Sequence, residues 1–445
     1  MTAVPVSVVV VSRHRAGDLV RCLKALAQSD YPAVELVVVA DPEGVAAALT
    51  AGIGPLKTRV FDAANISAAR NLGVGLAAGD IVAFIDDDAV AEPNWLSRLV
   101  APLADPQVGI AGGFVRGRNG ISYQWQARWV DQTGVAHLLA AAEDPTLSPI
   151  PSPKAERGAL AVPLRAPLAR GTRAGGETTS LHPGTASRAI KTEGTNMAVR
   201  RSVLAELGGF DEGFRFYLDE TDLNLRAAKA GIATAIVPLA QVHHGFAASA
   251  RRRADRAPLD LGDIGASTVL FLRKHADPAL HAQALAALRQ EQGARLDGLI
   301  GRGDLTQAET LVLMQGLEAG IARGSAEPLT AETLIPAPPP FLPLAGTGPR
   351  SWLLLAGWSW QHPGLRTTAR TAAQAGKLVQ LMLFSLTTRP HRMQFHPDGY
   401  WEQTGGLFGR SDRSGPRLRQ FTLQSRVRAE CARLASVRDL GQPGG

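Results

Sequence analysis

The stretch Ile81–Leu96, IVAFIDDDAVAEPNWL, joins an apolar segment to an acidic triplet. Five apolar residues run directly into Asp86, Asp87 and Asp88. A short apolar run of this kind is typical of a strand that is buried on both faces of a sheet. Three adjacent carboxylates at its end repel one another, and burying them is costly unless a positive group lies nearby. The stretch therefore predicts either a solvated acidic loop or a cation site.

The segments before this stretch alternate between strand and helix patterns. Val4–Val11 and Val34–Ala40 have the composition of buried strands, and Ile66–Ala78 has a helical pattern that ends at a glycine. This alternation with short connections predicts a doubly wound α/β sheet. Ligands of such sheets lie beyond the carboxyl ends of the strands. The aspartates, the turn Ser12–Arg15 and Asp41 all lie at such ends.

Composition limits the classes of partner. The chain has 445 residues, enough for two or three domains, and a net charge of +7 with a pI near 9.8. A basic chain favours anionic partners such as nucleic acid, anionic lipid or phosphorylated ligands. The sequence has neither a basic and aromatic platform nor a helix-turn-helix pattern, so nucleic acid is not an expected partner.

The sequence favours a cytoplasmic location. No run approaches the roughly 18 apolar residues of a spanning helix. Met1–Arg15 does not resemble a signal peptide, because its apolar run precedes its basic residues. Cys22 and Cys431 are far apart and without metal-site spacing, which fits a reducing compartment.

Three parts follow from the changes in pattern. We expect an α/β domain at 1–257, a helical segment at 258–336 and, after a proline-rich linker, a small α/β module at 344–445. A proline-rich, basic loop at about 145–191 interrupts the first part, and its composition predicts mobility. This loop is either a plain insertion or a lid over an anionic ligand.

Two separate strings resemble the motifs of family-2 glycosyltransferases. Asn65–Leu96 is similar to that family's ARN-x-G…A-x-G-D-x-x-x-F-x-D-x-D string with its following P-x-W-L. Gly194–Gly231 is similar to its G-x-N-x-x-x-R-R…G-G-F-D-E-x-F…E-D-x-D-L-x-x-R string. The resemblance covers roughly residues 4–275. It implies a GT-A fold, which is a Rossmann-like mixed sheet with flanking helices, and a nucleotide-sugar donor, with a UDP-sugar as the first expectation.

The resemblance gives the three aspartates roles at the donor. Asp86 and Asp88 match the family's Asp-x-Asp, one toward the ribose and one on a divalent metal that bridges the diphosphate. Asp87 is grouped with the donor-binding residues, unless it points away. Mg²⁺ and Mn²⁺ prefer carboxylate oxygens and often bridge to phosphates. Without the wider motif, a solvent-exposed acidic turn without a ligand would explain the triplet better than a metal site does.

Other donor contacts follow from the same comparison. Asp41 matches an acidic residue that contacts the base or ribose, although an Asx turn also explains it. Arg70 matches the Arg of the ARN string, expected near base and diphosphate, with a structural ion pair as the alternative. Where the family has a threonine followed by Tyr-Asn, this chain has Ser12, Arg13 and His14. The resemblance therefore does not identify which residues contact the base at this edge.

The carboxylates of the second string supply the acid–base chemistry. Attack on a sugar by a hydroxyl requires removal of the hydroxyl proton. In the family a Glu-Asp pair does this through its second residue, and here the order is reversed. Glu220 is therefore the expected base, with Asp219 as the alternative. Asp222 is grouped with substrate binding, although helix capping and interaction with the helix dipole explain it better.

A histidine pair and an arginine run follow the last strand of this part. In some relatives a histidine here completes the metal shell, and we assign that role to His243 of the pair His243–His244. A structural histidine is the alternative. Arg251, Arg252 and Arg253 would bind a diphosphate or an anionic acceptor, unless they form a solvated charge run.

The resemblance implies an inverting, metal-dependent glycosyltransferase with a hydroxyl acceptor in surface polysaccharide or glycolipid synthesis. The alternative is a GT-A protein that binds nucleotide sugars without catalysis, which the reversed acidic pair favours. We expect residues from Leu344 onward to be unnecessary for donor binding. The ten arginines of Arg389–Arg438 either hold the protein peripherally at the inner face of the membrane or are solvated on a module packed against the catalytic domain.

Overall fold

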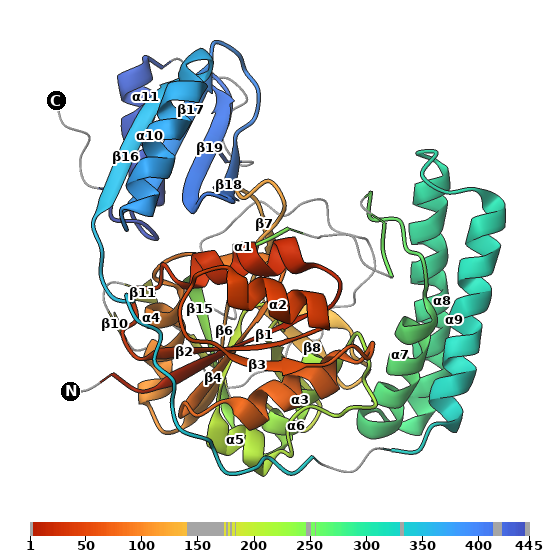
Figure 1. Ribbon diagram of the computed structural model, residues 1–445. Helices are drawn as coiled ribbons and strands as arrows, with labels where there is room; N and C mark the ends of the chain where they lie inside the picture. Colours follow the sequence, from red (N-terminus) through yellow and green to blue (C-terminus); the bar gives the residue numbers. More distant parts are fainter. Residues whose placement is uncertain are drawn as a thin grey trace.

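The computed structural model describes residues 3–139, 173–174, 177–178, 180–182, 184–245, 251–253, 255–329, 333–412 and 421–440. Among these residues, ten strands form a mixed central sheet in the order β12-β15-β6-β14-β4-β1-β2-β3, with β5 on β15 and β7 on β6 (Figure 1). Its strands are β1 (Val6–Ser12), β2 (Val34–Ala40), β3 (Lys57–Val60), β4 (Ile81–Asp86), β5 (Ala89–Ala91), β6 (Val108–Arg116), β7 (Tyr123–Trp125), β12 (Ser180–His182), β14 (Met197–Arg200) and β15 (Ala233–His244).

The register of the parallel strands gathers the polar residues at one edge. β1 pairs in parallel with β4 and with β2, so that Val11 lies opposite Asp86 and Ser12 lies opposite Ala40. The ends of all three strands therefore meet, as the sequence predicts. β14 runs antiparallel between β4 and β6, which makes the sheet mixed.

Helices cover both faces of this sheet, and each face has its own apolar core. One face carries α1 (Ala16–Leu26), α2 (Pro42–Thr50), α4 (Trp95–Val100) and the 3₁₀ turn η1 (Ala101–Ala104). The other carries α3 (Ile66–Leu76), α5 (Arg201–Glu206) and α6 (Asp219–Lys229). The strands contribute valines to both cores, since alternate side chains of a strand point to opposite faces.

Much of the predicted basic loop at about 145–191 lies outside the described residues. The described part of its end is not a loop. β12 joins the central sheet, and β13 (Arg188–Lys191) pairs with β8 (Arg128–Asp131) in a small sheet that also contains β9 (Ala136–Leu138). Two short strands, β10 (Arg173–Ala174) and β11 (Glu177–Thr178), pair with each other. The pairing of β13 with β8 places Lys191 beside the site described below.

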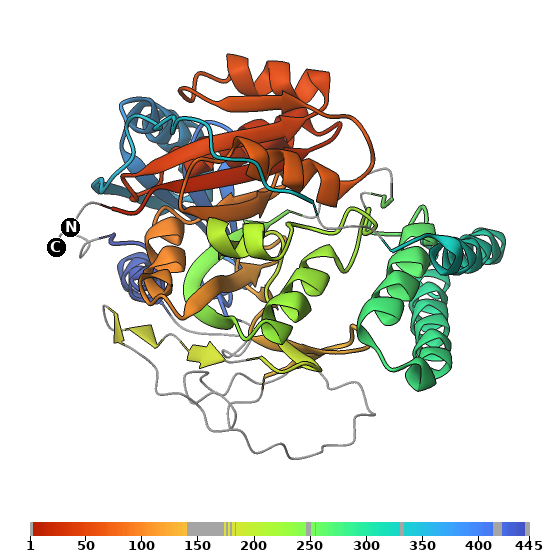
Figure 2. The same ribbon diagram turned by 90° about the horizontal axis from the view of Figure 1, so that it is seen from below.

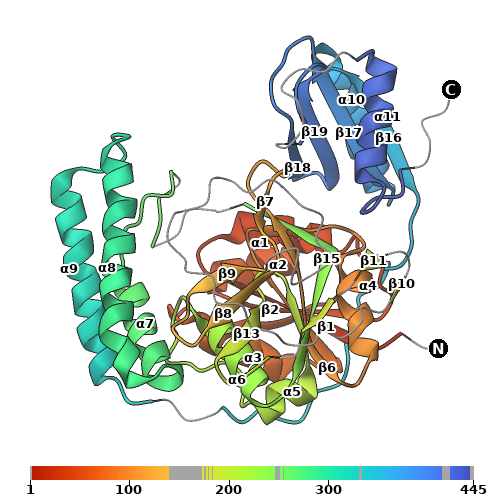
Figure 3. The same cartoon turned by 180° about the vertical axis from the view of Figure 1, so that it is seen from behind.

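The helical segment consists of α7 (Gly262–His275), α8 (Pro278–Ile300) and α9 (Gln307–Ala326). Close approach of α7 and α9 requires glycine, because a Cβ on Gly320 would lie 1.9 Å from the carbonyl oxygen of Gly262. The α8–α9 hairpin and the C-terminal module lie on opposite sides of the catalytic domain (Figures 1 and 3). Within the described ranges, no helix is both long and apolar enough to cross a membrane.

The C-terminal module is a four-stranded sheet in the order β16-β17-β19-β18 with helices packed against it. Its elements are β16 (Trp352–Trp358), η2 (Ser359–Gln361), α10 (His362–Gln374), β17 (Leu378–Ser385), β18 (Arg392–His396), β19 (Tyr400–Gly406) and α11 (Leu423–Leu434). The linker before it runs across the catalytic domain (Figure 2). The backbone N–H groups of Leu342 and Leu344 donate to Glu35 Oε2 and the Val34 carbonyl, both at 2.8 Å.

The arginines near the C-terminus are not simply solvated. Arg426 and Arg438 are buried, and Arg433 Nε donates to Glu430 Oε2 at 2.8 Å. Arg98 of the catalytic domain donates to the Ser436 carbonyl, also at 2.8 Å. The module therefore packs against the α/β domain of residues 1–257, as one of the two alternatives expected. That alternative also expected the arginines to be solvated, which is wrong for Arg426 and Arg438.

Candidate active site

The acidic triplet follows β4 directly, and a histidine at the end of β15 lies beside it. His244 Nε2 lies 3.1 Å from Asp88 Oδ1 and 3.9 Å from Asp86 Oδ2. One ligand atom from each of the three residues lies within 4.8 Å of the others. Two carboxylates and an imidazole fit a divalent metal such as Mn²⁺. Burial opposes protonation of His244, but Asp88 and Asp86 raise its pKa, so a proton competes with a metal here.

His243 is not part of this cluster, which contradicts the role predicted for it. Adjacent residues of a strand point to opposite faces, so only one of the two histidines can face the aspartates. His243 Nε2 lies 2.8 Å from Glu92 Oε1, and its ring centroid lies 4.8 Å from that of Trp401 in the C-terminal module. The structure thus places His244, and not His243, beside the Asp-x-Asp.

Asp87 is held by Ser12, the last residue of β1, and by Arg15, which directly precedes α1. Ser12 Oγ donates to Asp87 Oδ2 at 2.6 Å, and Arg15 Nη2 lies 2.6 Å from Asp87 Oδ1. Arg15 Nη1 also lies 3.4 Å from Asp88 Oδ2. Burial raises the pKa of Asp87 to about 7, against the charge of Arg15. Arg15, which sequence reasoning missed, supplies the positive group that the triplet requires.

Arg70 connects the two motif strings. Its Nη1 forms an ion pair with Asp219, and its Nη2 lies 3.3 Å from Asp86 Oδ1. A Cβ on Gly194 would lie 2.4 Å from Nη2 of this arginine, so a larger residue there would have to displace the guanidinium. These ion pairs correspond to the structural ion pair expected as the alternative for Arg70. They also hold Asp219 and Glu220 next to the cluster of Asp86, Asp88 and His244.

The turn before α6 is strained. Tyr217 and Leu218 have φ angles of 72° and 65°, in the left-handed region that non-glycine residues rarely adopt. Each such residue costs roughly 1–3 kcal/mol, and such strain is concentrated at functional sites. The turn delivers Asp219 and Glu220 as the first residues of the helix.

The two carboxylates at the start of α6 have different partners. Glu220 Oε1 accepts a hydrogen bond from Lys191 Nζ, and the side chain of Glu220 is 15% exposed against 5% for Asp219. Burial opposes ionisation of Glu220, but Lys191 lowers its pKa. Burial raises the pKa of Asp219 despite its pairing with Arg70. The pKa shifts of the two carboxylates thus run in opposite directions, and the ionised form is favoured at Glu220 by Lys191.

Asp222 faces away from this cluster, against its predicted grouping with substrate binding. Its carboxylate is fully buried, with His275 Nε2, Lys274 Nζ and Arg226 Nε each 2.8 Å away. Burial opposes ionisation, but these donors hold the pKa of Asp222 well below its usual range. Asp222 thus anchors α6 to α7.

Asp41 fixes the turn that carries the residues after β1. Its carboxylate accepts from the backbone N–H of His14 at 2.8 Å and from that of Gly44 at 3.4 Å, which caps α2. His14 has a φ of 56°, and the bond to Asp41 holds it there. Asp41 thus has a local structural role, as the alternative expected, but it caps α2 through the N–H of Gly44.

Two residues of the arginine run have acidic partners. Arg251 Nη2 lies 2.7 Å from Asp263 Oδ2, and Arg253 Nη2 lies 2.6 Å from Asp255 Oδ2. Burial lowers the pKa of Arg252, although Asp88 raises it. The charges of Arg252 and Asp88 therefore attract each other.

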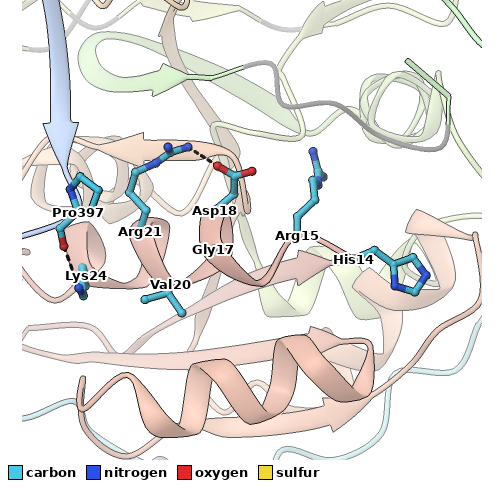
Figure 4. Close-up of a pocket in the computed structure, with 8 residues that line it drawn as sticks. All are labelled: His14, Arg15, Gly17, Asp18, Val20, Arg21, Lys24 and Pro397. Atoms are coloured by element: carbon cyan, nitrogen blue, oxygen red, sulfur yellow. Dashed lines mark hydrogen bonds and ion pairs between the residues drawn. The ribbon is translucent and has the colours of Figure 1, made fainter. Parts of the chain in front are cut away.

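A groove of about 440 Å³ runs along α1 and ends at the C-terminal module (Figure 4). It is lined by His14, Arg15, Gly17, Asp18, Val20, Arg21, Lys24 and Pro397. Arg21 pairs with Asp18, and Lys24 Nζ donates to the Pro397 carbonyl at 2.8 Å. Because Arg15 also contacts Asp87 and Asp88, this basic groove opens beside the acidic cluster.

Replacing His244 by Gln is expected to weaken Mn²⁺ binding roughly tenfold or more, because even residues that only support a metal ligand contribute 10–100-fold. Calorimetric titration of the protein with Mn²⁺ in the presence of UDP or GDP measures this. His281 on α8 serves as the control position, and His281→Gln should bind as the wild type does. Equal affinity of all three proteins would exclude His244 as a ligand.

Comparison with known proteins supports the family. A family model described as glycosyltransferase like family 2 matches residues 4–256. The O-antigen biosynthesis protein RfbC of Myxococcus xanthus is 29% identical over 267 residues, which are 57% of this chain and 18% of that protein. The N-acetylglucosaminyl-diphospho-decaprenol L-rhamnosyltransferase of Mycobacterium tuberculosis is 42% identical over 59 residues, 13% of this chain and 19% of that one. The chain thus spans less than a fifth of the length of these relatives.

Solved structures with low similarity include the mannosyltransferase PcManGT from Pyrobaculum calidifontis in complex with GDP-Man and Mn²⁺. It has 18% identity and a TM-score of 0.41, over 73% of this chain and 88% of that one. The family match and the mixed sheet with helices on both faces confirm the predicted GT-A fold. Because the family model covers more than half of its length, the chain belongs to the family-2 glycosyltransferases.

Proposed function

We propose that this protein transfers a sugar, with inversion, from a nucleoside-diphosphate donor to a hydroxyl acceptor, with Mg²⁺ or Mn²⁺ held by Asp86, Asp88 and His244. The observation that supports this most strongly is the convergence of these three ligand groups within 4.8 Å at the carboxyl edge of β4. Arg70 connects this cluster to the carboxylate pair of α6. A donor site and a proton acceptor therefore lie together, as direct displacement requires.

The residues around the cluster have separate roles in the proposed transfer. A bound divalent metal would act as a Lewis acid on the diphosphate. The acceptor oxygen attacks the anomeric carbon, the bond from that carbon to the diphosphate oxygen breaks, and the hydroxyl proton passes to a carboxylate. We assign the proton to Glu220, which is the more exposed of the pair and whose charge Lys191 favours. Asp219 then positions Arg70, and Arg15 balances the charge of the triplet.

The names of the relatives indicate a substrate class. They include O-antigen and succinoglycan biosynthesis proteins and a rhamnosyltransferase named for a diphospho-decaprenol acceptor. We propose synthesis of a surface polysaccharide or glycolipid, with a UDP-sugar as the first donor to test. We propose the cytoplasm as its location, peripherally at the inner face of the membrane. Sedimentation with anionic liposomes at physiological salt tests that location, and protein that stays in the supernatant contradicts it.

A second candidate is a nucleotide-sugar-binding protein without catalysis. The ion pair of Glu220 with Lys191 favours it, because the pair occupies the carboxylate that a base needs. Release of nucleoside diphosphate from a panel of UDP-, GDP- and dTDP-sugars in Mn²⁺ separates the two candidates. The proposed enzyme hydrolyses at least one donor slowly and loses this activity in EDTA. A protein that binds a donor and never turns it over supports the second candidate.

Replacing Lys191 by Met is expected to shift the acidic limb of the pH–rate profile upward. Lys191 lowers the folded-state pKa of Glu220, so the base stays ionised to lower pH in the wild type. Removing a positive charge at this distance raises the pKa of a carboxylate by roughly 1–3 units. The variant should therefore lose activity at a higher pH as the solution is acidified. Lys377, exposed on the C-terminal module, is the control. An unshifted limb in Lys191→Met would show that Glu220 is not the titrating base.

A further inference from the structure

The C-terminal module contacts the strand pair that carries two of the proposed metal ligands. β5 pairs antiparallel with β15, so that Ala89 lies opposite His244 and Val90 opposite His243. Asp88 directly precedes β5, and its carbonyl accepts from the Gly245 N–H at 2.8 Å. The separation of Asp88 and His244 is therefore set by this short ladder.

The far end of the ladder is joined to the module by a buried arginine. Arg438, 346 residues beyond Glu92, contacts both oxygens of that carboxylate, with Nε 2.8 Å from Oε2 and Nη2 2.7 Å from Oε1. Oε1 of Glu92 also lies 2.8 Å from His243 Nε2. Glu92 follows β5 and His243 belongs to β15, so one carboxylate ties the two strands together and one arginine holds it.

Aromatic rings of the module and the catalytic domain enclose this contact. The Arg438 guanidinium carbon lies 3.9 Å from the Trp401 ring centroid, and the His243 ring lies tilted at 56° to the same tryptophan. Glu92, Arg438 and Trp401 are each at most 2% exposed. Ion pairs this deep are sensitive to loss of one partner, because the other charge is left buried.

We propose that Arg438, acting through Glu92 and His243, is a positioning residue for the Asp88–His244 pair, so that the C-terminal module is part of the catalytic unit. This rests on the metal role proposed for Asp88 and His244. It replaces the expectation that residues from Leu344 onward are unnecessary for donor binding.

The test uses the full chain with Arg438→Met and, as the control, Arg428→Met, which removes an exposed arginine of α11. Hydrogen exchange of the metal-free proteins is compared in peptides covering 88–92 and 242–245. Mn²⁺ affinity is measured with UDP or GDP as the probe, by the EPR signal of the free ion. Arg438→Met should exchange faster in both peptides with β1 and β2 unchanged, and should bind Mn²⁺ roughly tenfold more weakly. Arg428→Met should match the wild type in both measurements.

The double variant Glu92→Gln with Arg438→Met removes both charges, so no buried carboxylate is left unpaired if the single variant fails to fold. It should show the same faster exchange and weaker Mn²⁺ binding. The proposal is overturned if a folded Arg438→Met or double variant exchanges hydrogen in both peptides at the wild-type rate and also binds Mn²⁺ with wild-type affinity. If the wild type itself binds no Mn²⁺ with either nucleotide, the proposed function fails, while the exchange comparison still decides whether Arg438 holds the strand pair.

Discussion

Asp88→Asn is expected to lower metal-dependent donor turnover by roughly 10³-fold or more. Loss of a charged ligand removes a Lewis acid that contributes several kcal/mol to the transition state, and each 1.36 kcal/mol is about a factor of ten. Asn keeps the volume of a side chain that is only 2% exposed and leaves an oxygen near His244, so the fold should persist. Release of UDP or GDP from nucleotide sugars in Mn²⁺ measures the effect.

The matched control is Asp80→Asn, an exposed carboxylate immediately before β4. Asp80 lies just before the start of β4, whereas the cluster lies at the end of β4. The Asp80→Asn protein should therefore retain the activity of the wild type. Circular dichroism establishes that both variants are folded. Folded Asp88→Asn protein with undiminished Mn²⁺-dependent turnover would remove Asp88 from the metal site.

Glu220→Gln is expected to lower turnover by roughly 10²–10⁴-fold, the usual contribution of a general base. Nucleotide affinity should stay within about twofold, since Glu220 contacts Lys191 rather than the acidic triplet. The glutamine retains an oxygen that can accept from Lys191, so the change isolates the loss of basicity. Single-turnover transfer and calorimetry with UDP or GDP separate the two quantities.

Asp219→Asn distinguishes the two carboxylates. Asp219 pairs with Arg70, which also contacts Asp86, so this variant should weaken nucleotide binding as well as turnover. The assignments are reversed if Asp219→Asn has unchanged nucleotide affinity and no turnover while Glu220→Gln remains active. That result would make Asp219 the base.

The strands and the edge that carries the site could be predicted because the signal is local. Val34–Ala40 is a strand with the predicted bounds, and Ile81–Ile85 runs into the aspartates as expected. The choice between His243 and His244 could not be made in this way. The pairing of β15 with β6 shifts register between Val237 and Gln241, and such a shift breaks the alternation from which a side chain's face is inferred.

The counter-charges of the site were missed for a different reason. Arg15 neutralises aspartates more than seventy positions later, and Lys191 meets Glu220 only because β13 pairs with β8. Composition counts charges without identifying their partners. For the same reason Arg438 is interpreted from the sequence as part of a solvated basic tail. Its partner Glu92 lies 346 residues earlier in the chain and cannot be recognised from composition.

Calorimetric titration of the protein with UDP and with GDP, in Mn²⁺, after EDTA, and after Mn²⁺ is restored, tests the proposed metal site at Asp86, Asp88 and His244. At least one nucleotide should bind in Mn²⁺, its affinity should fall roughly tenfold or more in EDTA, and Mn²⁺ should restore it, because Asp86, Asp88 and His244 would hold a metal that binds the diphosphate. Equal affinity with and without the metal, or no binding of either nucleotide, would contradict the central claim.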